Sequence, residues 1–237
     1  MANHNINWAA MTPRALTTRL KILTIQHLHQ LALRRITRTI KALPPQTIPD
    51  RELLSALRRA WGNEGYSADV DYLAEVAKMA AGACGPVLEC GTGLTTLILG
   101  LLAGRRGIHV TALEHLPEWH ATIANALNAC RISGVHIHIA ALRDYEGFAW
   151  YDPPFHRLPN GFAHVVCDGP PEVTAGGRFG LLPVMYEHLI NGATILLDDA
   201  TTAIGSATLS RWQKEWGLAV DLKHTSEGIY AVAKFHK

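Results

Sequence analysis

Two glycines of this chain, Gly91 and Gly93, form a turn after an apolar run at positions 86–90, with Glu89 just before it. Glycine lets a backbone approach a ligand closely, and ligands of open α/β sheets bind beyond the carboxyl ends of strands. A dinucleotide-binding turn needs a third glycine where Thr96 stands, and a phosphate loop needs a lysine that this turn lacks. A carboxylate here would repel pyrophosphate and attract a cation. The turn therefore predicts a ligand with a cationic amino group.

A second acid, Glu114, closes the next apolar run, at positions 108–113. A carboxylate at the end of a second strand can accept hydrogen bonds from both hydroxyls of a ribose. S-adenosylmethionine carries such a ribose and a cationic amino group, so Glu89 and Glu114 together indicate this cofactor. Gly91 and Gly93 alone are also explained by a tight turn without a ligand.

Three further acids follow later apolar runs. Asp168 ends the run at 163–167, and Asp198 and Asp199 end the run at 194–197. Neighbouring parallel strands would place them on one rim, where carboxylates are ligands for Mg²⁺ and a metal would lower the pKa of a substrate hydroxyl. We predict Asp168 and Asp198 as catalytic and all three acids as a candidate magnesium site. The alternative is that Asp168 contacts the cofactor while one acid of the pair caps the next helix.

Strands and helices alternate along most of the chain and would position these acids. Five strands are predicted at 86–90, 108–113, 135–139, 163–167 and 194–197. Helices are predicted at 15–43, 50–60, 69–81, 94–102, from Pro117, and at about 177–190 and 203–216. Two final strands, near 218–222 and 228–233, have no helix between them and predict an antiparallel hairpin. This alternation is typical of an α/β fold with a parallel sheet covered on both faces.

From Trp61 to the C-terminus the chain resembles the class I S-adenosylmethionine-dependent methyltransferases, whose glycine motif is an acid, any residue, Gly, any residue, Gly. It resembles most a bacterial subgroup with five shared segments: Trp61-Gly62-Asn63, positions 88–96, Trp150-Tyr151-Asp152, Asp168-Gly169-Pro170-Pro171 and Leu197-Asp198-Asp199-Ala200. The resemblance implies a Rossmann-like, seven-stranded, mostly parallel sheet in the order 3-2-1-4-5-7-6, with the last strand antiparallel. It implies that the methionine end of the cofactor contacts Glu89, Gly91, Thr92, Gly93 and Thr95. The ribose would be held by Glu114 and the adenine by the backbone of Ala141 and Leu142, with His115 and Asn63 in the same site.

The acidic rim is also similar to that of the catechol O-methyltransferases, where one Asp and an Asp-Asn pair hold magnesium. Here Asp199 replaces the Asn, and Pro171 stands where those enzymes have a lysine base. A general base must therefore come from elsewhere, and His115, His156 and Arg178 are expected in loops that could face the pocket. Asp152-Pro153-Pro154-Phe155 is similar to the motif of base-amino methyltransferases, but the residues before it predict a poor strand.

Charge is unevenly distributed along the chain. Residues 1–60 hold ten Lys or Arg against Asp50 and Glu52, whereas the rest holds more acids than bases. We therefore predict a basic helical cap at 1–60 and a cofactor-binding domain at 61–237. The basic helix at 12–43 is expected to cover the domain or form a homodimer, with a peripheral membrane contact and nucleic-acid binding as alternatives. The sequence has no apolar run long enough to span a membrane, and its first residues lack the basic and then apolar order of a secretory signal. The four cysteines fall in no metal-ligand spacing and are expected to be reduced thiols. A cytoplasmic location is therefore expected.

These observations predict a methyltransferase that acts on an oxygen of a small molecule or of a glycan- or lipid-linked acceptor, with S-adenosylmethionine as cofactor and Mg²⁺ as a candidate second one. The alternatives are an RNA methyltransferase that uses the basic segment, a cofactor-binding scaffold without catalysis, and a dehydrogenase.

Overall fold

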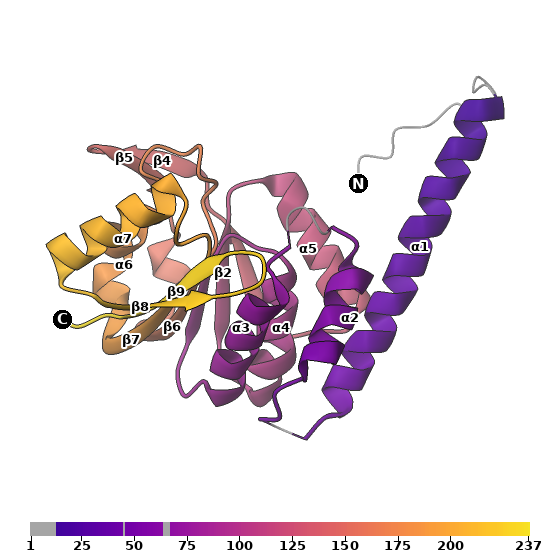
Figure 1. The fold of residues 1–237 in the computed structure, drawn as a ribbon, viewed down its shortest axis with the longest axis horizontal. Coiled ribbons are helices and arrows are strands. Elements are labelled where there is room, and N and C mark those ends of the chain that lie inside the picture. The colour runs from indigo at the N-terminus through magenta and orange to yellow at the C-terminus, as the bar shows by residue number, and fades with distance from the viewer. Residues whose placement is uncertain (1–12, 45, 64–66) are drawn as a thin grey trace.

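A seven-stranded sheet forms the centre of the molecule in the computed structural model, which describes residues 13–44, 46–63 and 67–237 (Figure 1). The strands lie in the order β3-β2-β1-β6-β7-β9-β8. Their bounds are β1 Val87–Cys90, β2 Val110–Glu114, β3 Val135–Ile139, β6 Phe162–Cys167, β7 Leu189–Leu197, β8 Ala219–His224 and β9 Ile229–Lys234. β9 pairs antiparallel with both β7 and β8, while the other pairs are parallel. Since β4 and β5 form a separate hairpin, the order within the sheet is the predicted 3-2-1-4-5-7-6, which is confirmed.

Helices cover both faces of this sheet. Their bounds are α1 Pro13–Ala42, α2 Arg51–Trp61, α3 Val70–Gly82, α4 Leu94–Leu102, α5 Pro117–Ala129, α6 Leu181–Met185 and α7 Ala203–Trp216. Side chains alternate along the strands, so that Val166 and Leu196 join a core with α2, α3 and α4, whereas Val165 and Leu197 join a second core with α6 and α7. The predicted two-faced packing is therefore confirmed.

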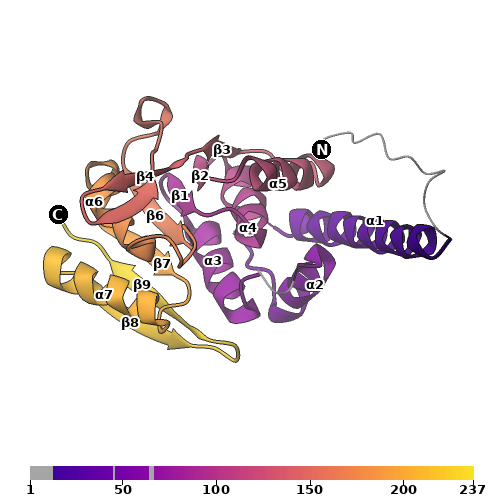
Figure 2. The same cartoon turned by 90° about the horizontal axis from the view of Figure 1, so that it is seen from above.

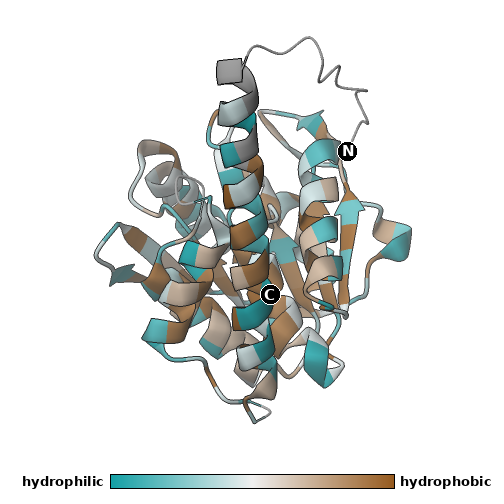
Figure 3. Cartoon of the chain, turned by 90° about the vertical axis from the view of Figure 1, so that its right-hand side faces the viewer, coloured by the Kyte–Doolittle hydropathy of each residue, from teal (hydrophilic) through white to brown (hydrophobic). Residues whose placement is uncertain are grey.

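The two N-terminal helices pack beside α3 and α4 (Figure 2). Ile40, Leu54 and Leu57 are fully buried in the same core as α3 and α4. The N-terminal half of α1 extends past α2, and Figure 3 shows polar and apolar residues mixed on its outer side. Residues 1–12 of the predicted cap lie outside the described residues. The division at residue 60 stays a prediction.

Three predicted elements are wrong in detail. The helix predicted at 177–190 is three short pieces, η5 Gly177–Gly180, α6 and η6 Tyr186–His188, and β7 begins at Leu189 rather than at 194. Glycines at its start interrupt the helical pattern, because Gly176 and Gly177 adopt positive φ values of +79° and +54°. The segment taken as a poor strand is β5 Phe148–Tyr151, which pairs with β4 Leu142–Tyr145 through a turn at Gly147, whose φ is +87°. Its aromatic residues favour a strand once they pack, as Trp150 does in the second core.

Among the described residues, no helix has both the length and the hydropathy needed to cross a membrane.

Candidate active site

A cavity of about 850 Å³ opens where β1, β2, β6 and β7 end. Its volume is in the range of small-molecule sites. The wall is formed by the β1–α4 turn, the end of β2 with the start of α5, the end of β5, the segments after β6 and β7, η5, the β8–β9 hairpin and the segment before α3. The lining residues are Asn63, Ser67, Ala68, Asp69, Gly91, Thr92, Glu114, His115, Leu116, Glu118, Trp119, Tyr151, Asp168, Gly169, Pro171, Glu172, Arg178, Asp198, Asp199, Glu227, Gly228 and Ile229. Parallel strands bring these segments together because their carboxyl ends share one edge of the sheet.

Glu114 is the most enclosed acid on this wall, with 3% of its surface exposed. Its Oε2 accepts hydrogen bonds from the Thr92 amide (3.2 Å) and hydroxyl (2.7 Å), and its Oε1 accepts one from the Leu116 amide (2.9 Å). The Trp119 indole donates to the Thr92 carbonyl at 2.7 Å, and His115 Nδ1 lies 3.2 Å from Glu114 Oε1. The carboxylate thus holds the glycine turn in place while Oε1 keeps a lone pair for a further donor.

Glu89 lies behind the cavity wall and is fully buried. Its two oxygens accept hydrogen bonds from the hydroxyls of Thr95 and Thr96, both at 2.7 Å. Burial raises the pKa of Glu89 to about 8. The acid therefore fixes the start of α4, and direct contact of Glu89 and Thr95 with a ligand stays a prediction.

The remaining predicted cofactor residues divide into two groups. Asn63 and His115 line the cavity beside the residues already described. Ala141 and Leu142 are exposed at the start of the β4–β5 hairpin, outside the described wall, where the Ala141 carbonyl accepts from the Asp152 amide. Their role at an adenine stays a prediction.

The three rim acids do converge. Asp168 follows β6 and Asp198 and Asp199 follow β7, and one carboxylate oxygen from each lies within 4.8 Å of the others. Burial raises the pKa of Asp168 to about 6 and that of Asp198 to about 7, where the neighbouring carboxylates add to the effect. Neither acid of the pair caps α7, as one alternative expected, because the Thr202 hydroxyl accepts the hydrogen bond of the Gly205 amide there.

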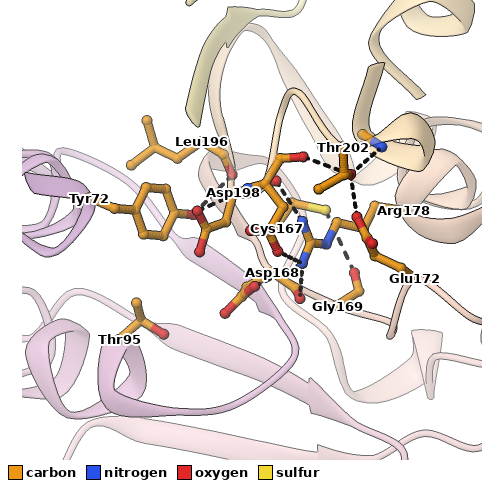
Figure 4. A network of polar contacts seen from close by, with 12 residues as sticks. Tyr72, Thr95, Cys167, Asp168, Gly169, Glu172, Arg178, Leu196, Asp198 and Thr202 are labelled. Carbon is orange, nitrogen blue, oxygen red and sulfur yellow. Dashed lines mark hydrogen bonds and ion pairs between the residues drawn. The ribbon is translucent and has the colours of Figure 1, made fainter. Parts of the chain in front are cut away.

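A buried arginine, Arg178, pairs with two of these acids, a contact that the sequence did not predict (Figure 4). Arg178 Nη2 lies 3.0 Å from both Asp168 Oδ1 and Asp199 Oδ2, and the side chain is 6% exposed. The sequence predicts Arg178 in a loop that could face the pocket, which the cavity wall confirms, but it does not predict the pairing with these acids. The available signal was its isolation, since it is the only lysine or arginine between positions 158 and 210.

One ion pair joins α2 to the far wall of the cavity, and one hydrogen bond joins that wall to the start of α3. The Arg58 guanidinium of α2 pairs with both carboxylate oxygens of Glu227, at the tip of the β8–β9 hairpin. The Thr225 hydroxyl of the same tip donates to Asp69, which caps α3.

Two other features singled out in the sequence lie away from the cavity. His156 is exposed outside the described wall, and Asp152 with its following prolines lies after β5 rather than at an end of the main sheet.

Solved structures resemble this chain in fold. An SAH-bound methyltransferase from Podospora anserina is 11% identical with a TM-score of 0.56, covering 96% of this chain and 99% of that one. An O-methyltransferase from Bacillus cereus in complex with SAH is 12% identical with a TM-score of 0.54, and the match covers 79% of this chain and 92% of that one. A precorrin-6Y C5,15-methyltransferase from Geobacter metallireducens is 15% identical with a TM-score of 0.53, and the match covers 72% of this chain and 90% of that one. The chain has the Rossmann-like methyltransferase fold. No protein-family model matches the sequence, and no curated protein matches it.

Proposed function

We propose that the protein transfers the methyl group of S-adenosylmethionine to a hydroxyl oxygen of a small molecule or of a glycan- or lipid-linked acceptor. The observation that carries the proposal is Glu114, a nearly buried carboxylate that ends β2 on the cavity wall beside Gly91 and Thr92. A carboxylate in this position suits a ribose. The fold it shares with SAH-bound methyltransferases supports the same cofactor.

The charge of the cavity agrees with a cationic cofactor. Eight of its lining residues are acidic, and Arg178 is the sole lysine or arginine among the lining residues that the structure describes. A sulfonium nucleoside with an ammonium group gains from such a field, whereas a polyanionic acceptor is repelled. This favours a neutral or cationic acceptor over RNA.

The cofactor supplies, when bound, a methyl group made electrophilic by its sulfonium. The acceptor oxygen forms the new bond to carbon as the bond from sulfur to carbon breaks, and the hydroxyl proton leaves to a base. Asp198 is suited to take this proton because its pKa near 7 makes it a stronger base than an ordinary aspartate. Asp168, on the neighbouring strand end, lies with it on the cavity wall. Positioning and exclusion of water would supply most of the remaining rate.

Calorimetric titration with S-adenosylmethionine and with its demethylated product tests the cofactor. Wild-type protein should bind both, and Glu114→Gln should bind at least about tenfold more weakly because the ribose loses a charged partner. Glu187→Gln is the matched control, since Glu187 is exposed and outside the described cavity wall. The absence of heat with wild-type protein would overturn the proposal. Incubation with radiolabelled cofactor and fractionated host extract then reports the acceptor.

The rivals predict different results. A nucleic-acid methyltransferase would use α1, which carries seven Lys or Arg and no acid, and its RNA binding would weaken steeply with salt. A scaffold would bind the cofactor in an Asp168→Ala variant and label no acceptor. We also propose that α1 covers the domain, forms a homodimer or contacts a membrane surface, and that the protein is cytoplasmic.

A further inference from the structure

We propose that the Arg178 guanidinium takes the place of a divalent cation on the rim formed by Asp168, Asp198 and Asp199, so that this rim works without a metal. The inference concerns the charge balance of the rim and does not rest on the identity of the cofactor or acceptor. It corrects what the three acids suggest on their own, which is a magnesium site.

The contacts of Arg178 occupy one carboxylate oxygen of Asp168 and one of Asp199, where the two acids approach each other. Nη2 lies 3.0 Å from Asp168 Oδ1 and 3.0 Å from Asp199 Oδ2, so one nitrogen bridges acids from two strand ends. Magnesium requires oxygen ligands at about 2.0–2.1 Å in near-octahedral geometry. An ion seated between these two oxygens would meet the guanidinium itself, which carries a permanent positive charge.

The guanidinium is also held by the backbone. Nη1 donates to the Asp198 carbonyl at 2.5 Å and Nη2 to the Asp168 carbonyl at 2.9 Å, which ties the ends of β6 and β7 together (Figure 4). Displacing Arg178 would break these bonds as well as both ion pairs and leave buried groups without partners. The arginine is therefore a built-in part of the rim rather than a surface side chain that could swing aside.

Asp198 differs from the other two acids in its partners. Its Oδ1 accepts the Asp199 amide at 2.9 Å, and none of the described hydrogen bonds of Arg178 reaches its carboxylate. Arg178 thus neutralises and orients Asp168 and Asp199 and leaves the Asp198 carboxylate open toward the cavity that it lines. Arg178 is a positioning residue in this scheme.

A titration with Mn²⁺ tests the inference without any measurement of methyl transfer. Binding is measured as a loss of the electron paramagnetic resonance signal of free Mn²⁺. Wild-type protein should leave the free signal unchanged. Arg178→Gln, which removes the charge, should bind one Mn²⁺ and lower the free signal at concentrations about tenfold below those at which wild type shows no binding, since three carboxylates then face each other without a counterion. Adding Asp199→Asn to this variant should abolish the gain. Arg211→Gln, on the surface of α7, is the matched control and should behave as wild type.

Stoichiometric Mn²⁺ binding by wild-type protein that is lost in Asp199→Asn would overturn the inference. So would a folded Arg178→Gln protein, verified by circular dichroism, that binds no Mn²⁺. If Arg178→Gln does not fold, the wild-type titration decides alone, because that protein either binds the ion or does not. A failed cofactor titration would sink the proposed function and leave this result standing.

Discussion

Gly91 and Gly169 meet backbone to backbone at the cavity: a Cβ on Gly91 would lie 2.9 Å from the Gly169 nitrogen. Gly91 also has a φ of +84°, which side chains rarely adopt. Gly93 differs in both respects, since its backbone is extended and a Cβ there would approach no closer than 4.0 Å to Thr95 Oγ1. The first glycine is needed by the fold, and the second leaves space that the protein itself does not fill.

Alanine at each glycine should therefore have different effects. Gly91→Ala should lower the free energy of unfolding by about 2 kcal/mol or more, from backbone strain and the contact with Gly169. Gly93→Ala should change it by less than about 1 kcal/mol but weaken S-adenosylmethionine binding at least about tenfold, if the cofactor approaches this backbone. Urea unfolding and calorimetry measure both. Normal cofactor binding by Gly93→Ala would show that the cofactor does not approach there.

The buried Glu89 should make stability depend on pH. Its pKa is about 8 in the folded protein, against 4.5 for an unperturbed glutamate, because burial disfavours the charge. Between these values the folded state holds a proton that the unfolded state has lost, so the free energy of unfolding falls as pH rises through this window. Glu89→Gln keeps an oxygen acceptor for one threonine hydroxyl, places an NH2 donor beside the other, and removes that loss.

Urea unfolding at about pH 5 and about pH 8 compares the variant with wild type. The stability of Glu89→Gln relative to wild type should rise with pH, by on the order of a few kcal/mol. Asp168 and Asp198 also have raised pKa values, but they contribute equally to both proteins and cancel in the difference. The exposed Glu187→Gln is the control and should show no such trend. A difference that is flat with pH would mean that Glu89 is already ionised in the folded protein.

The fold could be predicted from the sequence wherever a strand or helix has a regular apolar pattern and a clear end. The strand at 135–139 and the helix at 203–216 have the predicted bounds. The segment at 177–190 could not be predicted, because its apolar residues suit one long helix, whereas the positive φ values of Gly176 and Gly177 leave only the short α6. β5 depends on tertiary packing of its aromatic residues, which no local pattern shows.

The site was predictable to the extent that strand ends position it. The convergence of Asp168 with the Asp198–Asp199 pair follows from neighbouring parallel strands, and the structure shows it. The place of Arg178 depends on how an irregular segment folds back over the rim, which periodicity does not encode. The role of Trp119 could not be predicted either. Its indole N–H donates a hydrogen bond to the Thr92 carbonyl, and this contact between α5 and the glycine turn leaves no pattern in the sequence.

The N-terminal helices should be part of the stable fold rather than a removable cap. Leu57 of α2 is fully buried in the core shared with α3 and α4, whereas Leu28 of α1 is 58% exposed. Leu57→Ala should cost about 2–5 kcal/mol through the lost burial and the cavity left behind, and Leu28→Ala less than about 0.5 kcal/mol. Urea unfolding of both variants measures this. Equal, small losses would favour an independent cap at residues 1–60.

The Arg58–Glu227 pair should control the acceptor side of the cavity. Glu227, Gly228 and Ile229 line the wall from the β8–β9 hairpin, and the ion pair fixes that hairpin to α2. Glu227→Gln should loosen the hairpin, seen as faster hydrogen exchange of its amides, with at most about 1 kcal/mol lost in stability because the pair is partly exposed.

The kinetic consequence separates the two ends of the cavity. With the acceptor found by labelling, KM for the acceptor should rise severalfold in Glu227→Gln, while the cofactor Kd stays at the wild-type value, since Glu114 and the glycine turn come from other strand ends. Glu215→Gln is the control, because it breaks an exposed pair with Arg211 on α7, outside the described wall. An equal change in cofactor Kd and acceptor KM would show that the hairpin does not form an acceptor-specific wall, and that α2 acts on the whole cavity instead.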